Sequence, residues 1–562
     1  MNDAPSPTTW IASARAARGR APSWLLGMEE PGSGPALASG LLGLAGREPT
    51  LAPLSAALAD WAFQRRPLRP EQASAAAANP GTPQPRRALA ATLAPLLAPP
   101  EDPRERDARQ AMRELLDAGE AGLAARHLLP RLRTPAGPAW LALAWEGLLR
   151  LGSAELPQGM LEATPLPGPL APLAQRLKAE WAALYLPTES ALREVEQVCP
   201  EHFGLWREYL LAELELRLGQ ARGRERLARL WRAMPWHPQL TLKLHTLLHP
   251  APATPSDFSG VAVLLYSWNK AELLERTLED LLRSDLRRAC VRFLDNGSTD
   301  AMPEVAARMA PRFGLDERGE PRFRAVRLPV NVGAPAARNW LLSLPEVRAS
   351  RWAAFLDDDV ELPGHWLEAL VSSAEERERA GEPVDVVGCR ITSATPPRTV
   401  QSADYHLLPP NDSVKTFVNY PEKIMVSENC ANDFDLGLFG YDRPATSVSG
   451  CCHLLSIAGV ERAGAFDIRF SPTQFDDLER DLRLGVAGLR VHYAGSLAIR
   501  HVQHSSLARA QSLTSIGHVF GNKIKLEGKY SLEEIRGLQQ AMHRRLEADL
   551  RAREDELLAT LE

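Results

Sequence analysis

Cysteine is scarce in this chain, with six residues among 562, and their spacing contains no Cys-x-x-Cys pair. The absence of such pairs excludes the common zinc-ligand spacings and is typical of a protein kept in a reducing compartment. The adjacent Cys451 and Cys452 are interpreted as core or loop lining rather than as a redox pair.

Long apolar runs and an excess of positive charge are missing as well. No segment approaches the roughly 18 uninterrupted apolar residues of a membrane-spanning helix, and the first residues lack the basic and apolar regions of a signal peptide. The formal net charge of −5 gives no signal for nucleic-acid binding. We therefore expect a cytoplasmic protein without a transmembrane segment or a nucleic-acid partner, and peripheral attachment to the inner face of the membrane stays open. The high Arg, Ala, Leu and Pro content is interpreted as bacterial coding bias.

A chain of 562 residues is too long for one hydrophobic core, so we expect roughly two to four domains. Ala, Pro, Gly and Leu dominate the first part, some of which is interpreted as linker. Composition divides the chain into an Ala/Pro-rich, partly helical segment at 1–105, a helical domain at 106–250, an α/β domain at 257–525 and an amphipathic C-terminal helix at 526–562.

The clearest helical unit runs from Leu205 to Gly219 and continues from Arg224 to Met234 before Pro235. Two helices separated by a Gly and closed by a Pro, with Trp206 in the first, resemble a tetratricopeptide-type repeat. Such pairs stack into solenoids that bind proteins, which would give this region a protein partner. A plain helical bundle packed on the following domain explains the same pattern, and both alternatives stay open.

Strand-like and helical patterns alternate after a Pro-rich linker at 250–257, which indicates βαβ units and a mostly parallel sheet. Ligands of such sheets bind beyond the carboxyl ends of the strands. The expected strands are Val261–Tyr266, Ala289–Leu294, Phe323–Arg327 and Trp352–Leu356, and the expected helices are Ala271–Arg283, Met302–Met309, Ala336–Leu342 and Trp366–Glu375.

Three adjacent carboxylates, Asp357, Asp358 and Asp359, follow the apolar run Trp352–Leu356 directly. Neighbouring anions repel each other and are costly to desolvate, so packing does not explain them. A hard divalent cation such as Mg²⁺ would turn the repulsion into coordination. A solvated acidic turn is the alternative interpretation.

Polar groups also follow the other expected strands. Ser267-Trp-Asn-Lys270 ends the first strand, and Asp295-Asn-Gly-Ser-Thr-Asp300 ends the second. Asp295 can accept a hydrogen bond from a planar base, although turn chemistry alone would also select these residues. Arg338 follows the Gly333 turn and can reach a phosphate, or it is simply solvated.

Further motifs follow downstream: Gly464-Ala-Phe-Asp467, then Asp476-Asp-Leu-Glu-Arg-Asp-Leu-Arg-Leu484 with Gly488, and Ala498-Ile-Arg-His501. In this order and spacing the motifs of residues 258–505 resemble family 2 glycosyltransferases, which are inverting enzymes with a GT-A fold, a Rossmann-like nucleotide-diphospho-sugar transferase fold. The resemblance implies a nucleotide-diphosphate sugar donor, with UDP favoured, and Mn²⁺ or Mg²⁺ as cofactor.

The resemblance also implies roles for individual residues. Asp295 would hold the base, Asp358 the ribose, and Asp359 the metal, with His501 as second ligand or phosphate contact. Asp477 would be the general base, with Asp476 as the alternative. The donor would lie against Ser267, Asn269, Asp295, Asn296, Arg338, Asp357 and Asp358.

The sequence departs from the family pattern at several positions. Asp476 replaces the usual Glu, Glu479 replaces an Asp and Arg480 replaces a Leu. The Gln-x-x-Arg-Trp element of processive members is absent, so we expect transfer of a single sugar. His504 is a rival to His501 as the strand-end ligand.

The most consistent function is transfer of one sugar from a nucleotide donor to a hydroxyl of a glycan or protein. A sugar-nucleotide nucleotidyltransferase is one alternative, but Ser267–Lys270 lacks the Gly-rich loop typical of that class. A non-enzymatic helical scaffold with a decayed transferase domain is another, and the intact acidic motifs argue against it.

Two further stretches are informative. Residues 395–450, rich in Asn, Asp and aromatics, would face the acceptor in a GT-A fold, although a long surface loop explains them equally. Ser531–Glu534 forms a capping box before a helix. One apolar stripe follows, for which docking on the catalytic domain and self-association are both open: Leu532, Ile535, Leu538, Met542, Leu546 and Leu550.

Overall fold

The computed structural model describes residues 5–27, 33–98, 100, 102–166, 168–253, 256–409, 411–415, 421–427, 430, 433–502 and 513–561. The chain divides into two units. The first comprises Met1–Leu244, Thr395–Arg398 and Glu554–Glu562, and the second comprises His245–Ala394 and Thr399–Arg553.

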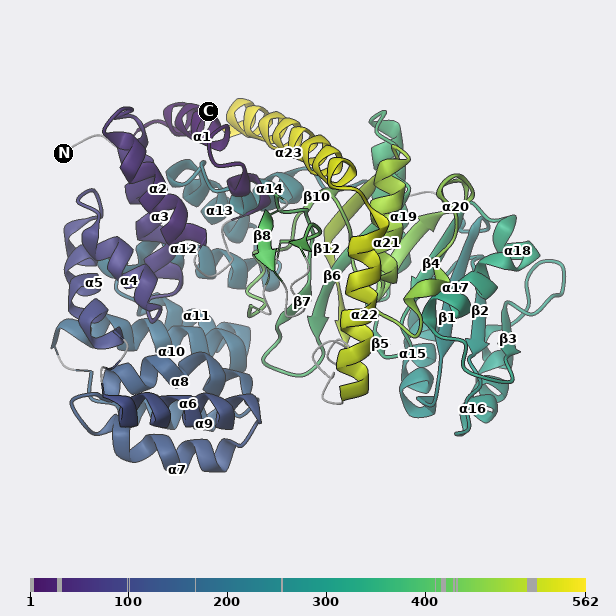
Figure 1. The fold of residues 1–562 in the computed structure, drawn as a ribbon, viewed down its shortest axis with the longest axis horizontal. Helices are drawn as coiled ribbons and strands as arrows, with labels where there is room; N and C mark the ends of the chain where they lie inside the picture. The colour runs from purple at the N-terminus through teal and green to yellow at the C-terminus, as the bar shows by residue number, and fades with distance from the viewer. Residues whose placement is uncertain are drawn as a thin grey trace. The chain divides into compact units, whose positions relative to one another are not determined.

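The N-terminal region is helical, as predicted (Figure 1). Neighbouring helices pack in pairs, such as α2 on α3, α4 on α5, α10 on α11 and α12 on α13. The helices are α1 (Pro7–Arg18), α2 (Ser33–Ala45), α3 (Leu51–Arg65), α4 (Pro70–Ala78), α5 (Gln84–Leu97), α6 (Pro103–Asp117), α7 (Ala121–Leu132), α8 (Gly137–Arg150), α9 (Glu155–Ala163), α10 (Ala171–Tyr185), α11 (Thr188–Glu196), α12 (Pro200–Arg217), α13 (Ala221–Ala233) and α14 (Pro238–Leu248), with short 3₁₀ turns η1 (Pro22–Leu26) and η2 (Gly168–Leu170).

The helix pair α12–α13 lies where the repeat-like unit was expected. Gly219 between the two helices has a φ of +69°, which a residue with a side chain rarely adopts. Trp206 and Trp231 are buried, one from each helix. Lys243 Nζ reaches Glu213 at 2.6 Å. The two helices are confirmed, and their assignment to a tetratricopeptide-type repeat stays a prediction.

The second unit is built on one mixed sheet with the strand order β10-β12-β6-β11-β4-β1-β2-β3. Strands β1 to β4, β6 and β12 run in one direction, and β11 and β10 run against them. The strands are β1 (Val261–Ser267), β2 (Cys290–Asp295), β3 (Phe323–Arg327), β4 (Trp352–Leu356), β5 (Val360–Glu361), β6 (Val386–Ser393), β7 (Val400–Ser402), β10 (Asp442–Ala445), β11 (Cys452–Ser456) and β12 (Val491–His501), with a separate pair β8 (Asn411–Lys415) and β9 (Pro421–Glu422). The predicted α/β class with a mostly parallel sheet is confirmed.

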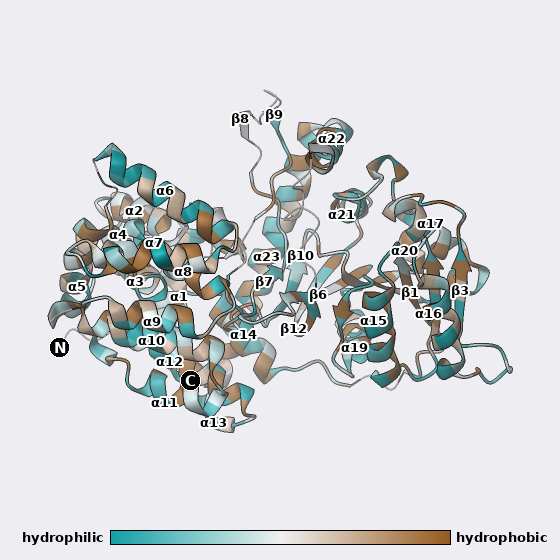
Figure 2. Ribbon diagram, turned by 90° about the horizontal axis from the view of Figure 1, so that it is seen from below, coloured by the Kyte–Doolittle hydropathy of each residue, from teal (hydrophilic) through white to brown (hydrophobic). Residues whose placement is uncertain are grey.

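Helices cover both faces of this sheet (Figure 2). Helices α15 and α19 lie on one face, and α17 and α20 lie on the other. The main hydrophobic core lies between the sheet and the helices α15 and α19, where Leu278 of α15 and Trp366 of α19 are buried. The helices are α15 (Ala271–Arg283), α16 (Met302–Met309), α17 (Ala334–Ser343), α18 (Pro345–Arg348), α19 (Trp366–Arg379), α20 (Ile457–Ala463) and α21 (Asp476–Val486), with η3 (Ala310–Phe313) and η4 (Ile468–Phe470).

A second, smaller core joins α21 to the C-terminal helices α22 (Leu513–Lys529) and α23 (Leu532–Leu561). Leu482 of α21, Leu526 of α22 and Ile535 of α23 are buried together, and the cluster also includes Leu407 and Ile424 from the 395–450 stretch. We call this set of residues the second core. Ile535 belongs to the apolar stripe of α23, as the docking alternative predicts, while self-association stays a prediction.

The capping box of α23 forms as the sequence predicts. Ser531 N donates to Glu534 Oε2 at 2.7 Å, and Glu534 N donates to Ser531 Oγ at 3.1 Å. Among the described residues, no helix combines the length and the apolar character that crossing a membrane would need. All six cysteines carry free thiols.

Candidate active site

The predicted polar residues gather beyond the carboxyl ends of β1, β2 and β4. Ser267, the last residue of β1, is the register partner of Asp295, the last residue of β2. Asp357, Asp358 and Asp359 follow β4, which pairs with β1 on its other side. The parallel register therefore brings three separate segments of the sequence to one edge of the sheet.

Asp358 is buried at the centre of this edge. It accepts hydrogen bonds from Ser267 Oγ and from Lys270 Nζ, the latter at 2.9 Å, and Lys270 Nζ also lies 3.1 Å from Asp359 Oδ2. Burial raises the pKa of Asp358 to about 6, against the opposing charge of Lys270. Lys270 is a site residue whose role the sequence reasoning missed, and its signal was a basic residue directly after a strand-end turn.

Asp359 and His501 face each other. His501 Nε2 lies 2.9 Å from Asp359 Oδ1, a buried atom that accepts no hydrogen bond of good geometry from the residues that the structure describes. Burial would raise the pKa of Asp359, but His501 and Lys270 outweigh it and lower that pKa. On the far side of the ring, His501 Nδ1 donates to Gln401 Oε1 at 2.9 Å, which leaves Nε2 to face the carboxylate. Gln401 is a second residue that the sequence gave no reason to select.

These two groups fit a divalent cation. Neighbouring ligands of an octahedral Mg²⁺ or Mn²⁺ with bonds of about 2.1 Å lie about 3 Å apart, close to the observed separation of Asp359 Oδ1 and His501 Nε2. The carboxylate of Asp357 and the thiol of Cys451 also lie within 4.8 Å of His501. Oxygen and imidazole ligands suit these ions better than a thiol does, which disfavours Cys451. The predicted pair, Asp359 and His501, stays the prediction, and Asp357 is a further carboxylate within reach of His501.

Asp295, the carboxylate predicted to bind the nucleotide base, already accepts a backbone hydrogen bond in this structure. Asp295 Oδ1 accepts Ser298 N at 2.8 Å. Within the described part of the chain, the buried Oδ2 accepts no hydrogen bond of good geometry, and Arg327 Nε lies 3.3 Å away. Oδ2 is enclosed beside Arg327, and its contact with a nucleotide base stays a prediction.

The neighbouring amides hold loops together. Asn296 Nδ2 donates to Asn331 Oδ1 at 2.9 Å, and Asn296 Oδ1 accepts Val332 N at 3.0 Å. Asn269 Oδ1 accepts Thr299 N at 2.7 Å. In this structure Asn269 and Asn296 connect the loops that follow the strands, and their direct contact with a donor stays a prediction.

Arg338 joins the two sides of the site. Its buried guanidinium bonds Asp476 Oδ2 and lies 3.9 Å from Asp357 Oδ1, between the rings of Tyr266 and Phe466. Burial would lower the pKa of Arg338, but Tyr266, Asp476 and Asp357 outweigh it and raise that pKa. The observed partner of Arg338 is a carboxylate, and its contact with a donor phosphate stays a prediction.

The two adjacent aspartates of α21 differ in environment. Asp476 is buried against Arg338, and burial raises its pKa. Asp477 is half-buried and accepts Gly450 N at 2.9 Å through Oδ2 and Leu478 N at 2.8 Å through Oδ1. A Cβ on Gly450 would come within 3.1 Å of Asp477 Oδ2, so only glycine leaves this space open. Gly450 is a third position that the sequence reasoning missed.

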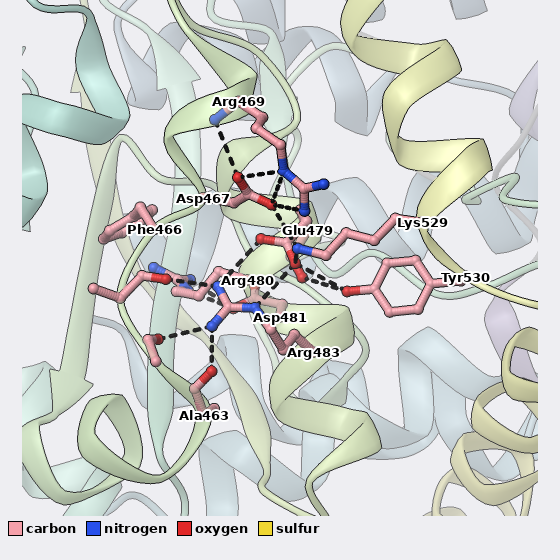
Figure 3. Close-up of polar contacts among 12 residues, drawn as sticks. Ala463, Phe466, Asp467, Arg469, Glu479, Arg480, Asp481, Arg483, Lys529 and Tyr530 are labelled. Atoms are coloured by element: carbon pink, nitrogen blue, oxygen red, sulfur yellow. Dashed lines mark hydrogen bonds and ion pairs between the residues drawn. The ribbon is translucent and has the colours of Figure 1, made fainter.

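The departures from the family pattern on α21 have structural partners (Figure 3). Glu479 is buried and accepts Arg483 Nε at 3.0 Å, and Arg483 also donates to the carbonyl of Ala465 at 2.7 Å. Arg480 is buried, bonds Asp481 Oδ1 at 2.6 Å and donates to His453 Nε2 at 3.0 Å. The charged residue in place of Leu is therefore neutralised by its own neighbour.

Of the predicted site residues, most lie together in the structure, and others lie outside its described part. Ser267, Asp295, Arg338, Asp357–Asp359, Asp476, Asp477 and His501 are brought into one region by the contacts above. His504, the rival of His501, and Asn432 of the 395–450 stretch lie outside the described residues.

Comparisons with solved structures give low similarity. Mannosyltransferase PcManGT from Pyrobaculum calidifontis, solved with GDP-Man and Mn²⁺, is 17% identical, with 63% of this chain and 85% of that chain covered and a TM-score of 0.32. GalNAc-T7, solved with UDP, GalNAc and Mn²⁺, is 11% identical with a TM-score of 0.33, and the match covers 43% of each chain. A search of curated proteins found no match.

The family comparison is specific. Residues 262–433 match the sequence profile of Glycosyl transferase family 2, a range that includes β1, β2, β4 and the three aspartates after β4. Asp476, Asp477 and His501 lie beyond the matched range. From the strand-end residues and this match, we conclude that the chain contains a glycosyl transferase family 2 domain.

Proposed function

We propose that this chain is a metal-dependent, inverting glycosyltransferase that moves one sugar from a nucleotide-diphosphate donor to an acceptor hydroxyl. The observation that carries the proposal is the Arg338 bridge. It places the donor-side carboxylate Asp357 and the α21 carboxylate Asp476 against one guanidinium, so the two acidic motifs share one site.

On the donor side, Asp295 Oδ2 accepts an N–H of the nucleotide base, and Asp358 accepts the ribose hydroxyls. Asp359 and His501 would hold Mn²⁺ or Mg²⁺, which stabilises the negative charge that builds on the leaving diphosphate. Lys270 adds a positive charge beside these carboxylates. We propose uracil as the nucleotide base of the donor.

On the acceptor side, Asp477 takes the proton of the attacking hydroxyl. Asp477 is half-buried and not paired with Arg338 in this structure, whereas Asp476 is buried and held by that arginine, which favours Asp477 as the base. A single displacement at the anomeric carbon inverts its configuration. Absence of the Gln-x-x-Arg-Trp element supports transfer of one sugar at a time.

The acceptor is a glycan or a protein. The 395–450 stretch contributes to the second core beside α21, which supports its proposed role on the acceptor side. The helical N-terminal region is proposed to recruit or orient a protein partner.

The test is a donor screen on the full chain. UDP- and GDP-sugars are incubated with and without Mn²⁺ and with a mixed acceptor pool, and release of the nucleoside diphosphate is measured. We expect Mn²⁺-dependent release from a UDP-sugar, with the anomeric configuration of the product read by NMR. Pyrophosphate release from a nucleoside triphosphate and a sugar phosphate would instead identify a nucleotidyltransferase, and no turnover with any donor would favour the scaffold alternative.

A further inference from the structure

The loop that leads into α21 has an unfavourable backbone. Gln474 and Phe475, directly before Asp476, have φ values of +84° and +65°. Residues with side chains rarely adopt this left-handed region, and they do so only where surrounding contacts impose it. Something outside the loop must therefore hold residues 470–475 in place.

Asn522 of α22 makes those contacts. Its side chain is buried, and Nδ2 donates to the carbonyls of Phe470 and Thr473, each at 2.8 Å, and to that of Gln474 at 3.3 Å. The Asn522 Oδ1 atom accepts Lys525 Nζ at 2.9 Å. One amide therefore binds three carbonyls of the loop that precedes the two aspartates.

Lys525 supports the same loop from the surface. Its Nζ also donates to the carbonyl of Arg469 at 2.7 Å. Asn522 and Lys525 together hold four backbone carbonyls between residues 469 and 474. We call this set of contacts the loop clamp.

Residues at the end of α22 also contact α21, the helix that carries Asp476 and Asp477 (Figure 3). Lys529 Nζ reaches Glu479 Oε1 at 2.5 Å and Asp467 Oδ2 at 2.7 Å, and the hydroxyl of Tyr530, just after the helix, lies 3.1 Å from Glu479 Oε1. Glu479 lies one helical turn below Asp476 on α21, so these contacts fix the start of that helix.

The opposite side of α22 binds the 395–450 stretch. Glu527 accepts Lys423 N at 2.9 Å and Ile424 N at 3.0 Å, and Lys423 Nζ donates to the carbonyl of Tyr530 at 2.7 Å. One helix thus holds both segments that the proposed mechanism places on the acceptor side.

We propose that α22 is a positioning element for the general base, and that Asn522 is its principal positioning residue. Asn522 does not touch the reacting atoms. It holds the 470–475 loop so that Gln474 and Phe475 keep their left-handed backbone, which places Asp477 where the acceptor hydroxyl is deprotonated. This inference rests on the proposed function of Asp477.

The proposal predicts a separation of donor binding from transfer. The donor-side residues lie at strand ends. The described hydrogen bonds of Asn522 are with the 470–475 loop and Lys525 only. Loss of the clamp should therefore displace Asp477 and leave donor affinity unchanged. A misplacement of about 1 Å can reduce a catalysed rate about 100-fold.

The test variant is Asn522→Asp in the full chain. The carboxylate keeps the shape of the side chain and the Lys525 contact, but it presents oxygen where the amide donated to three carbonyls. We expect kcat for transfer to fall about 10- to 100-fold. Affinity for the nucleoside diphosphate with Mn²⁺, measured by calorimetry, should stay within about twofold. Hydrogen exchange of residues 470–477 should accelerate.

A milder variant covers the case in which the buried substitution prevents folding. Lys525→Met changes an exposed position and removes one of the four carbonyl contacts of the loop clamp, together with the bond to Asn522 Oδ1. We expect kcat to fall about threefold at unchanged donor affinity. His518→Ala changes an exposed residue of the same helix and should leave kcat at the wild-type value.

The outcomes distinguish the two levels of the argument. A wild-type chain without donor binding or transfer would overturn the proposed function and this inference with it. An active wild type with unchanged kcat in Asn522→Asp, or in Lys525→Met where the first variant does not fold, would overturn the inference alone. A parallel loss of donor affinity and kcat would also overturn it, because it would indicate general destabilisation.

Discussion

The proposed donor side of this site, at the strand ends, and the proposed general-base side, at the start of α21, are built in different ways. The donor-side carboxylates stand at the ends of β2 and β4, and the apolar residues of these strands lie in the main core beneath the sheet. The base-side carboxylates stand at the start of α21, after two residues with left-handed backbone, and they are supported by the second core. Strand register holds the first set, and side-chain contacts from distant segments hold the second.

This difference indicates how each side can vary. A strand end keeps its position as long as the sheet forms, because hydrogen bonds and buried side chains along the whole strand fix it. The 470–475 loop depends on a few contacts from α22, so we expect that single substitutions in α22 can move Asp477 without unfolding the sheet. Arg338 of α17 connects the two sides through Asp357 and Asp476.

Removing the metal should produce the largest effect and act through the donor side. We expect Asp359→Ala, or excess EDTA with the wild type, to reduce donor turnover by at least about 10³-fold, since a bound cation contributes several kcal/mol to the transition state. The circular dichroism spectrum should stay that of the wild type. Full activity in EDTA would refute a metal-dependent mechanism.

Removing the proposed general base alone should reduce the rate of sugar transfer and leave donor binding unchanged. Asp477→Asn keeps the shape and removes the proton acceptor, so we expect kcat to fall about 10²- to 10⁴-fold with unchanged donor affinity by calorimetry. Asp476→Asn is the matched control. It leaves Arg338 without its buried partner, so we expect a lower melting temperature and a smaller rate loss. An inactive Asp476→Asn beside a near-normal Asp477→Asn would move the base by one residue.

Gly450→Ala should disturb the junction between the two sides. The new Cβ would approach Arg338 Nη2 at 3.0 Å and Asp477 Oδ2 at 3.1 Å, which displaces both groups by a few tenths of an ångström. We expect kcat to fall about 10-fold, because small displacements of catalytic groups are costly. Gly521→Ala on α22 is the control, because no described residue lies within 4 Å of its added Cβ. An unaffected Gly450→Ala enzyme would show that the junction tolerates displacement.

The smallest effect concerns pH and is confined to the donor side. The pKa of Asp358 is about 6, and Asp359 outweighs burial to raise the pKa of His501. Protonation neutralises the first group and makes the second a cation, so both changes weaken cation binding at low pH. We expect Mn²⁺ affinity to rise severalfold between pH 5.5 and 8. His501→Gln should flatten this dependence, and an affinity independent of pH would contradict the assignment of these ligands.

The sequence predicted the strands and the carboxylates at their ends well because the signals for both are local. An apolar run followed directly by carboxylates specifies both a buried strand and what lies at its end, and Trp352–Leu356 with Asp357–Asp359 needs no information from elsewhere in the chain. The strands and helices from 261 to 379 form close to the predicted bounds for the same reason. The motif on α21 identified Asp476 and Asp477 in the sequence. It did not predict which residues contact them or hold the preceding loop.

The residues that the sequence could not identify act through long-range contacts. Gln401 and His501 are 100 residues apart, Arg338 and Asp476 are 138 apart, and Asn522 and Phe470 are 52 apart. An amide or a glycine has no fixed role until packing selects its neighbours, because the same group can cap a turn, bind a loop or face solvent. The sequence by itself determined which carboxylates the site contains. Only the tertiary structure decided which cation pairs with each of them and which helix holds the base in place.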